Sequence, residues 1–144
     1  MKFSALLILL AGVVVPVGVF GVSETVPGPI PARVLRVIDG DTIVVRVRIW
    51  LGQDIDTQVR LDGVDAPELK GQCSHERRLA EKARDLIQSH TIAGVVVLRK
   101  IKYGKYAGRV VARVDSIDGK ELSQILIRAG LGRAYDGGRR LSWC

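Results

Sequence analysis

Two runs of alternating residues, each joined to a short acidic segment, constrain the fold of this chain most strongly. In residues 42–50 apolar β-branched residues alternate with arginines, and in residues 55–62 they alternate with acidic and other polar residues. A period of two predicts half-buried β-strands. The acidic segment 39–41 precedes the first run, and the acidic segment 62–68 follows the second. Because neighbouring strands bring their ends together, we expect the two acidic segments to lie close to each other.

The rest of the chain supplies more strands and two helices. Further strands are predicted at residues 33–38, 95–101 and 109–114, and helices at residues 75–89 and 122–129. Ser74 is expected to cap the first helix, and Gly130 to end the second. Antiparallel strands joined by short turns, with a helix inserted between the third and the fourth, favour an α+β fold over a parallel α/β sheet. We therefore predict a small five-stranded OB-fold-like β-barrel with two to three helices.

The N-terminal residues differ in composition from the rest of the chain. Residues 5–22 are apolar, interrupted by Pro16, and follow a single lysine. This pattern indicates that residues 1–22 are a signal peptide or an N-terminal membrane anchor. A Pro-rich linker is expected at 23–32, followed by one folded domain at 33–144. We expect an exported monomer, which is periplasmic or secreted if the segment is cleaved and attached to the membrane through residues 5–22 if it is not.

The chain contains two cysteines, Cys73 and Cys144. In an exported protein an even number of cysteines favours a disulfide. Two thiols alone are too few ligands for a structural metal site. The sequence therefore predicts a bridge that ties the loop after the second acidic segment to the C-terminus.

The charges indicate a basic protein with a local acidic site. The net charge is +7, which attracts polyanions. Aromatic residues are few, which argues against a protein that binds single-stranded nucleic acid by stacking bases on aromatic side chains. Asp41 and Asp65 at adjacent strand ends could share one hard divalent cation, because such ions prefer oxygen ligands. Glu68 could reach a water on that ion, and Arg60 could bind a phosphate with two hydrogen bonds. Each piece taken alone also fits an ordinary turn or surface loop, but together they favour phosphodiester hydrolysis at a metal.

Several ordered motifs resemble one known family. The segments Val37-Ile38-Asp39-Gly40-Asp41-Thr42 and Val59-Arg60-Leu61-Asp62-Gly63-Val64-Asp65-Ala66-Pro67-Glu68, with 105–109 and 126–131, resemble the thermonuclease or staphylococcal nuclease-like family. The resemblance covers about residues 33 to 136. It implies an OB-fold barrel and Ca²⁺-dependent hydrolysis of DNA and RNA by a sugar-nonspecific endonuclease.

The resemblance also implies roles for individual residues. By position, Asp41 and Asp65 correspond to Ca²⁺ ligands, and Ala66 to a residue that binds the ion through its backbone carbonyl. Asp39 corresponds to an outer-shell acid, and Glu68 to the residue that orients or deprotonates the attacking water. Arg60 and Arg109 correspond to the pair that binds the phosphate and stabilises the pentacoordinate transition state. Tyr135 corresponds to a tyrosine of the nucleotide pocket.

One motif departs from the family pattern. The family usually has an arginine directly after Lys-Tyr-Gly, whereas here Ala107 lies between Tyr106 and Gly108. An earlier Lys-Tyr-Gly, at residues 102–104, would place Lys105 in the arginine position. We favour Arg109 because it directly precedes a predicted strand, and we keep Lys105 as the alternative and as a candidate substrate-binding residue.

Two other functions remain open at this point. The domain could be a catalytically inactive OB-type module that binds nucleic acid or protein, although a pure binder of polyanions gains nothing from clustered carboxylates. It could also be a membrane-tethered structural protein whose basic surface contacts lipid headgroups. Phosphodiester hydrolysis is the interpretation that assigns a role to both the acids and the arginines.

Overall fold

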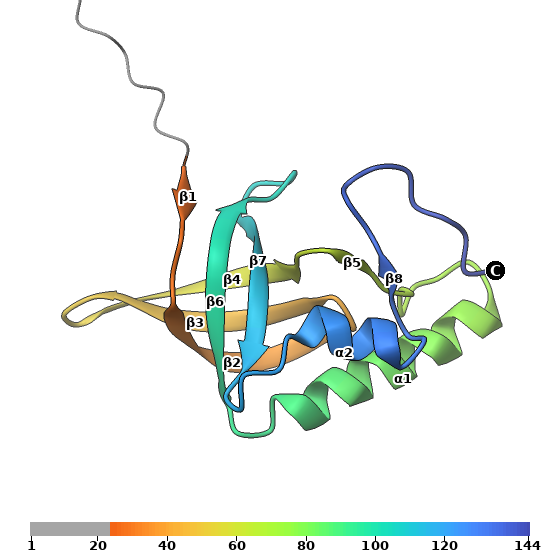
Figure 1. The fold of residues 1–144 in the computed structure, drawn as a ribbon, viewed down its shortest axis with the longest axis horizontal. Coiled ribbons are helices and arrows are strands. Elements are labelled where there is room, and N and C mark those ends of the chain that lie inside the picture. The colour runs from red at the N-terminus through yellow and green to blue at the C-terminus, as the bar shows by residue number, and fades with distance from the viewer. Residues whose placement is uncertain (1–23) are drawn as a thin grey trace, which may run out of the picture.

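The computed structural model describes residues 24–144, which form a closed five-stranded β-barrel with two helices beside it (Figure 1). The barrel strands are β2 (Ile30–Asp39), β3 (Thr42–Trp50), β4 (Gln53–Leu61), β6 (Val95–Tyr103) and β7 (Arg109–Ser116). Their order is β6-β2-β3-β4-β7, and pairing of β6 with β7 closes the barrel. The predicted α+β class and five-stranded barrel are confirmed. One pair, β4 with β7, is parallel rather than antiparallel, because the chain crosses the molecule through a helix and β6 between these two strands.

Short strands lie outside the barrel strands. Thr25–Val26 form β1, which pairs with the end of β6. Val64–Asp65 form β5, which pairs with β8 (Arg133–Ala134). Periodicity cannot predict two-residue strands, but this small sheet fixes Asp65 against the C-terminal part of the chain.

The segment expected as a linker differs from the expectation. Within residues 23–32, β1 pairs with β6, and β2 begins at Ile30 rather than Arg33. Ala32 is 2% exposed and belongs to the core, whereas most of residues 24–31 are exposed. Pro27 and Pro29 lie between β1 and β2, and Pro31 is compatible with its place in β2 because proline is tolerated at the beginning of a strand.

Two helices lie within the described residues, α1 (Ser74–His90) and α2 (Leu122–Arg128). Cys73, not Ser74, is the N-cap of α1, and its sulfur accepts a hydrogen bond from the Glu76 backbone N–H at 3.4 Å. The expected cap is wrong by one residue because Cys73 keeps an extended backbone, whereas Ser74 is already helical.

The core connects the helices to the barrel. Ile43, Val59 and Leu61 fill the barrel interior, and Ile87 of α1 and Leu126 of α2 belong to the same buried cluster. Burial of these side chains supplies most of the driving force for folding. As a result α1 packs against the turn between β2 and β3, and that turn carries the first acidic segment.

The N-terminal predictions concern residues that lie largely outside this description. Residues 1–22, expected as a signal peptide or anchor, and residue 23 of the expected linker are not described. Between residues 24 and 144, no helix has the length and apolar character needed to cross a membrane.

Candidate active site

The two acidic segments meet at one end of the barrel, where Arg60 joins them. Its Nη1 lies 3.1 Å from Asp41 Oδ2, and its Nη2 lies 3.5 Å from Asp65 Oδ1. Both aspartates are buried, at 4% and 3% exposure. The prediction that adjacent strand ends bring Asp41 and Asp65 together is therefore confirmed. Two buried carboxylates that share the Arg60 guanidinium form a site that attracts further positive charge.

Asp41 is held by the segments on both sides of the site. Oδ2 accepts a hydrogen bond from the Ala66 backbone N–H at 3.0 Å, and Oδ1 accepts one from the Thr42 hydroxyl at 3.0 Å. Burial raises the pKa of Asp41, and this effect exceeds the lowering by the Arg60 charge and by the hydrogen bonds from Ala66 and Thr42. The carboxylate form of Asp41 is thus disfavoured unless positive charge is brought closer.

The loop after β5 is fixed by acids from other elements. Asp39 Oδ1 accepts a hydrogen bond from the Leu69 N–H at 3.2 Å, so the predicted outer-shell residue ties the turn to this loop. Glu76, on α1, accepts from the Glu68 N–H at 3.3 Å and from the Gln72 N–H at 3.0 Å. Glu76 was not among the site residues predicted from the sequence. A sequence pattern could have indicated it, because Glu76 lies three residues after the N-cap of α1, where a glutamate often accepts hydrogen bonds from backbone N–H groups.

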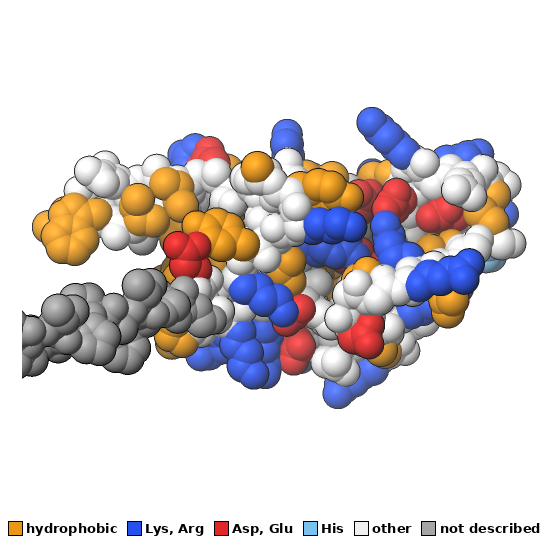
Figure 2. Space-filling view, turned by 90° about the horizontal axis from the view of Figure 1, so that it is seen from above, with side chains coloured by type: hydrophobic (Ala, Val, Ile, Leu, Met, Phe, Trp, Pro, Cys, Tyr) orange, Lys and Arg blue, Asp and Glu red, His pale blue; other side chains and the backbone are white. Residues whose placement is uncertain are grey.

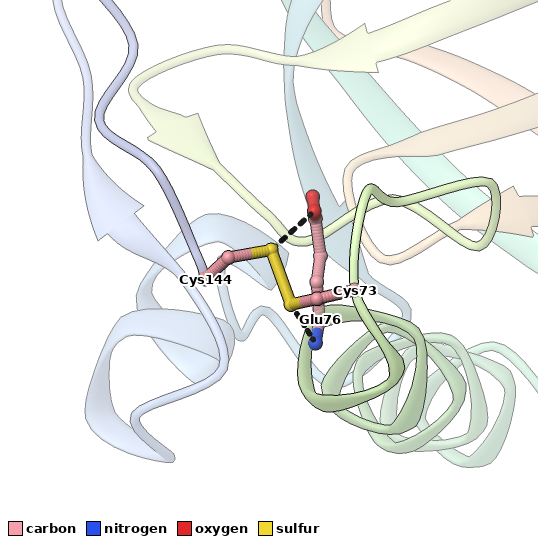
Figure 3. Close-up of side chains that lie close together, drawn as sticks. All are labelled: Cys73, Glu76 and Cys144. Atoms are coloured by element: carbon pink, nitrogen blue, oxygen red, sulfur yellow. Dashed lines mark hydrogen bonds between the residues drawn. A yellow bond between two sulfur atoms is a disulfide. The ribbon is translucent and has the colours of Figure 1, made fainter.

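The disulfide between Cys73 and Cys144 lies beside Glu76 and confirms the predicted pairing (Figure 3). Cys144 Sγ is 3.7 Å from Glu76 Oε2. Although these three side chains are close enough to hold a metal ion, both sulfurs are bonded to each other and are not thiolate ligands. The cluster therefore links the C-terminus to the loop that carries Glu68.

A pocket of about 720 Å³ opens next to the buried aspartates. Five of the predicted site residues line it: Arg60, Glu68, Lys105, Arg109 and Tyr135. In Figure 2, acidic side chains gather in the right half of the molecule, with lysine and arginine side chains directly beside them. Lysines and arginines outnumber the acids in the pocket lining, which suits an anionic ligand.

Arg109 and Arg60 lie on neighbouring strands of the pocket wall. In the parallel pairing of β4 with β7, Gln58 is opposite Arg109 and Arg60 is opposite Val111. Side chains at positions two apart share one face of a strand, so both arginines project from the same face of the sheet. The Arg109 guanidinium lies 5.0 Å from the centre of the Tyr106 ring, and its buried Nε has no hydrogen-bond partner among the described residues.

Tyr135 and Lys105 occupy the pocket differently. The Tyr135 ring lies 5.9 Å from the Arg60 guanidinium carbon, and its hydroxyl donates to the Gly138 carbonyl at 2.8 Å. Lys105 is exposed in the loop between β6 and β7. The structure thus places the alternative to Arg109 on the same pocket, but on a loop rather than a strand.

The C-terminal tail, residues 136–144, reaches the acids, a contact that was not predicted from the sequence. Arg140 forms ion pairs with Asp65 at 2.5 Å and with Glu68 at 2.6 Å. The Trp143 indole Nε1–H donates to Asp65 Oδ2 at 3.3 Å. The predicted disulfide could have indicated this contact, since a bridge at Cys144 brings the residues before it to the loop after β5.

Comparison with known proteins agrees with this geometry. The family described as staphylococcal nuclease homologues matches residues 58–140, which is more than half of the chain. The chain belongs to this family.

Similar curated proteins carry related names. Two proteins named as uncharacterized endonucleases, from Escherichia coli O157:H7 and Escherichia coli, are each 32% identical over 107 residues. These residues make up 74% of this chain and 62% of each relative. The aligned region therefore spans less than two thirds of the relatives' length.

Staphylococcal nuclease homologues generally depend on a metal ion, and the oxygen atoms of this site fit one. Asp41, Asp65 and the Ala66 carbonyl are hard donors of the kind that bind Ca²⁺ or Mg²⁺. A cation, the Arg140 guanidinium, already contacts part of this set, with Nη2 at 3.4 Å from the Ala66 oxygen and Nε at 2.5 Å from Asp65 Oδ1. The donor chemistry and this protein cation both support a cation site here.

Proposed function

We propose that this domain is an endonuclease that hydrolyses phosphodiester bonds of DNA and RNA in a Ca²⁺-dependent reaction. One observation carries the proposal: Arg60, Glu68 and Arg109 line a single pocket whose edge is joined to two buried aspartates through Arg60. Acids that hold a metal and arginines that face a phosphate are the groups needed for this reaction.

The residues divide the chemistry between them. Asp41, Asp65 and the Ala66 carbonyl would hold Ca²⁺, which when bound supplies Lewis-acid stabilisation of the phosphate charge. Arg60 and Arg109 bind the phosphate oxygens and stabilise the negative charge of the pentacoordinate transition state. Glu68 orients a water for in-line attack and accepts its proton, and the 5′-oxygen leaves. Tyr135 and Lys105 contact the nucleotide next to the cleaved bond.

The hydrolysis experiment compares wild type with Glu68→Gln on double-stranded DNA and on RNA, with Ca²⁺ and with a chelator. Wild type is expected to cleave both nucleic acids with Ca²⁺ and neither with the chelator. Loss of the general base is expected to lower the rate by about 10²–10⁴-fold while binding persists. Wild type that binds nucleic acid but does not cleave it with Ca²⁺ would instead support a binding module.

The proposal includes export from the cytoplasm. The apolar residues 5–22 and a disulfide between Cys73 and Cys144 support an oxidising compartment. Cell fractionation, with mass determination of the N-terminus, tests this and distinguishes a cleaved signal from a retained anchor. Recovery of intact protein in the cytosolic fraction would contradict export.

A further inference from the structure

The Arg140 guanidinium covers the groups to which the proposed reaction assigns the metal and the water. Its Nε donates to Asp65 Oδ1 at 2.5 Å, its Nη1 to Glu68 Oε1 at 2.6 Å and its Nη2 to the Ala66 carbonyl at 3.4 Å. One side chain therefore contacts an expected ligand carboxylate, an expected ligand carbonyl and the expected general base. These contacts are charge-assisted, which makes them stronger than hydrogen bonds between neutral groups.

The tail that carries Arg140 is fixed close to the site. Cys144 is bonded to Cys73 at the beginning of α1, as Figure 3 shows. The Trp143 ring lies 3.8 Å from the Arg133 guanidinium, and Arg133 Nη1 donates to the Ser142 carbonyl at 3.0 Å. The few residues between Arg140 and Cys144 can extend at most about 14 Å, so the disulfide keeps Arg140 at a high effective concentration near Asp65.

The electrostatic surroundings favour this position of Arg140. Asp65 is 3% exposed and accepts hydrogen bonds on both carboxylate oxygens. Without Arg140, Arg60 would be the remaining guanidinium between the two buried aspartates.

A metal ion needs the same oxygen atoms. Ca²⁺ binds its oxygen ligands at 2.3–2.6 Å as a general rule, so an ion on Asp65 and the Ala66 carbonyl would fill the space next to these atoms that the guanidinium now takes. The two cations cannot both contact this oxygen pair. Binding of one is therefore linked to release of the other.

We propose that Arg140 is an internal counter-cation of this site, which a metal ion must displace from Asp65 and the Ala66 carbonyl in order to bind. The inference rests on the proposed function for the assignment of these two groups as metal ligands. Arg140 also lines the pocket, so the displaced side chain has a space to enter. The disulfide, by keeping Arg140 near, lowers the affinity of the site for the metal.

Calorimetric titration of the full oxidised chain with Ca²⁺, without nucleic acid, tests the proposal. Arg140→Gln removes the competing cation, and we expect it to bind Ca²⁺ roughly tenfold more tightly than wild type, or more. Arg139→Gln is the matched control, since Arg139 has the same charge on the same tail and forms no ion pair with these acids in the described chain. It is expected to bind Ca²⁺ with an affinity within about twofold of wild type.

A second arm tests the tether and retains Arg140. The double variant Cys73→Ser, Cys144→Ser frees the tail, and its Ca²⁺ affinity is expected to rise toward that of Arg140→Gln. Adding Arg140→Gln to this double variant should then give little further change.

Three outcomes would overturn the proposal. One is equal or weaker Ca²⁺ binding by Arg140→Gln, which is expected if Arg140 holds the ligands in place. Another is an equal rise in Ca²⁺ affinity in Arg139→Gln, and the third is no Ca²⁺ binding by any variant. Tighter binding by Arg140→Gln in a protein that cleaves no nucleic acid would remove the proposed function and leave this inference intact.

Discussion

Asp41 and Asp65 carry the same charge but are compensated differently. Asp41 is paired with Arg60, an N–H and a hydroxyl, and burial still raises its pKa. Asp65 contacts two guanidinium groups and an indole N–H. The tail thus compensates Asp65 and leaves Asp41 as the less satisfied carboxylate. In the metal-free protein, ionisation of Asp41 therefore opposes folding.

The pH dependence of stability should reflect the raised pKa of Asp41. Because the folded-state pKa of Asp41 is raised above 3.8, its stabilising contribution is fully present below about pH 3.8 and is lost as pH rises through the folded-state value. Asp41→Asn cannot ionise, so in chelator its stability relative to wild type should rise as pH increases through this window. Urea unfolding between about pH 4 and pH 8 measures the difference. Asp39→Asn is the charge-matched control, and a stability difference for Asp41→Asn that does not change with pH would contradict the assignment.

Arg109 and Lys105 are the two candidates for the second phosphate-binding residue beside Arg60. Arg109 lies on β7 beside Arg60 and has a buried Nε without a partner in the described residues, whereas Lys105 lies on an exposed loop. We expect Arg109→Ala to lower kcat/KM by about 10²–10³-fold and Lys105→Ala by less than about tenfold. Steady-state hydrolysis of DNA under saturating Ca²⁺ measures both. The reverse ranking would assign the position to Lys105.

At the scale of elements, α1 packs directly on the turn that carries the first acidic segment. A Cβ built on Gly40 would lie 2.6 Å from the Ala83 Cβ and 3.2 Å from the Ala66 Cβ. The turn between β2 and β3 contains Asp39-Gly40, a dipeptide typical of hairpin turns. Yet Gly40 is not among the glycines with a positive φ. Glycine is required here by the close approach of the helix, which the local sequence does not reveal.

Gly40→Ala should therefore lower the free energy of unfolding by about 1–3 kcal/mol, as overpacking of a buried contact does. Adding Ala83→Gly removes the side chain that the new methyl group would meet. The double variant should be more stable than the sum of the two single effects, even though glycine inside a helix is itself unfavourable. Urea unfolding of the four proteins gives the coupling energy. Additive effects would show that the helix does not press on the turn.

The elements that sequence could predict are those with local signals. Alternation predicted β3 and β4, and a helical apolar stripe predicted α1. The beginning of β2 at Ile30 was missed because two prolines beside it resemble a linker, although Pro31 is paired with Val97. The pairing of β5 with β8 was missed because two residues carry no period. In the site, Asp41, Asp65 and Arg60 followed from adjacent strand ends, whereas Glu76 and Arg140 depend on long-range packing.

At the scale of the whole molecule, the C-terminal tail closes a loop across the site. The disulfide spans 71 residues of sequence and joins the beginning of α1 to the C-terminus, which lie side by side in Figure 1. The tail after β8 is otherwise held by contacts at Asp65, Glu68 and Arg133. These are few and partly exposed, so the bridge is the main covalent constraint on this part of the chain.

Removing the bridge should lower stability without changing the barrel. A loop of this length corresponds to about 4 kcal/mol in the chain-entropy description, and measured effects are often smaller, so we expect a loss of about 2–4 kcal/mol for Cys73→Ser, Cys144→Ser. Serine at position 73 keeps an acceptor for the Glu76 N–H, so the α1 cap is retained and the change reports the bridge. Urea unfolding in chelator measures the loss, with circular dichroism as the check that the secondary structure persists.

Limited trypsin digestion distinguishes local release of the tail from the loss of global stability when the bridge is removed. In the double variant, cleavage after Arg139 and Arg140 should become much faster than in wild type, because a freed tail keeps only a few partly exposed contacts and opens locally. Cleavage within β3 and β4 should rise only as far as global stability falls. If the tail stayed protected without the disulfide, Arg140 and Trp143 would be sufficient to hold it on Asp65. The tail would then belong to the folded domain independently of the redox state of its cysteines.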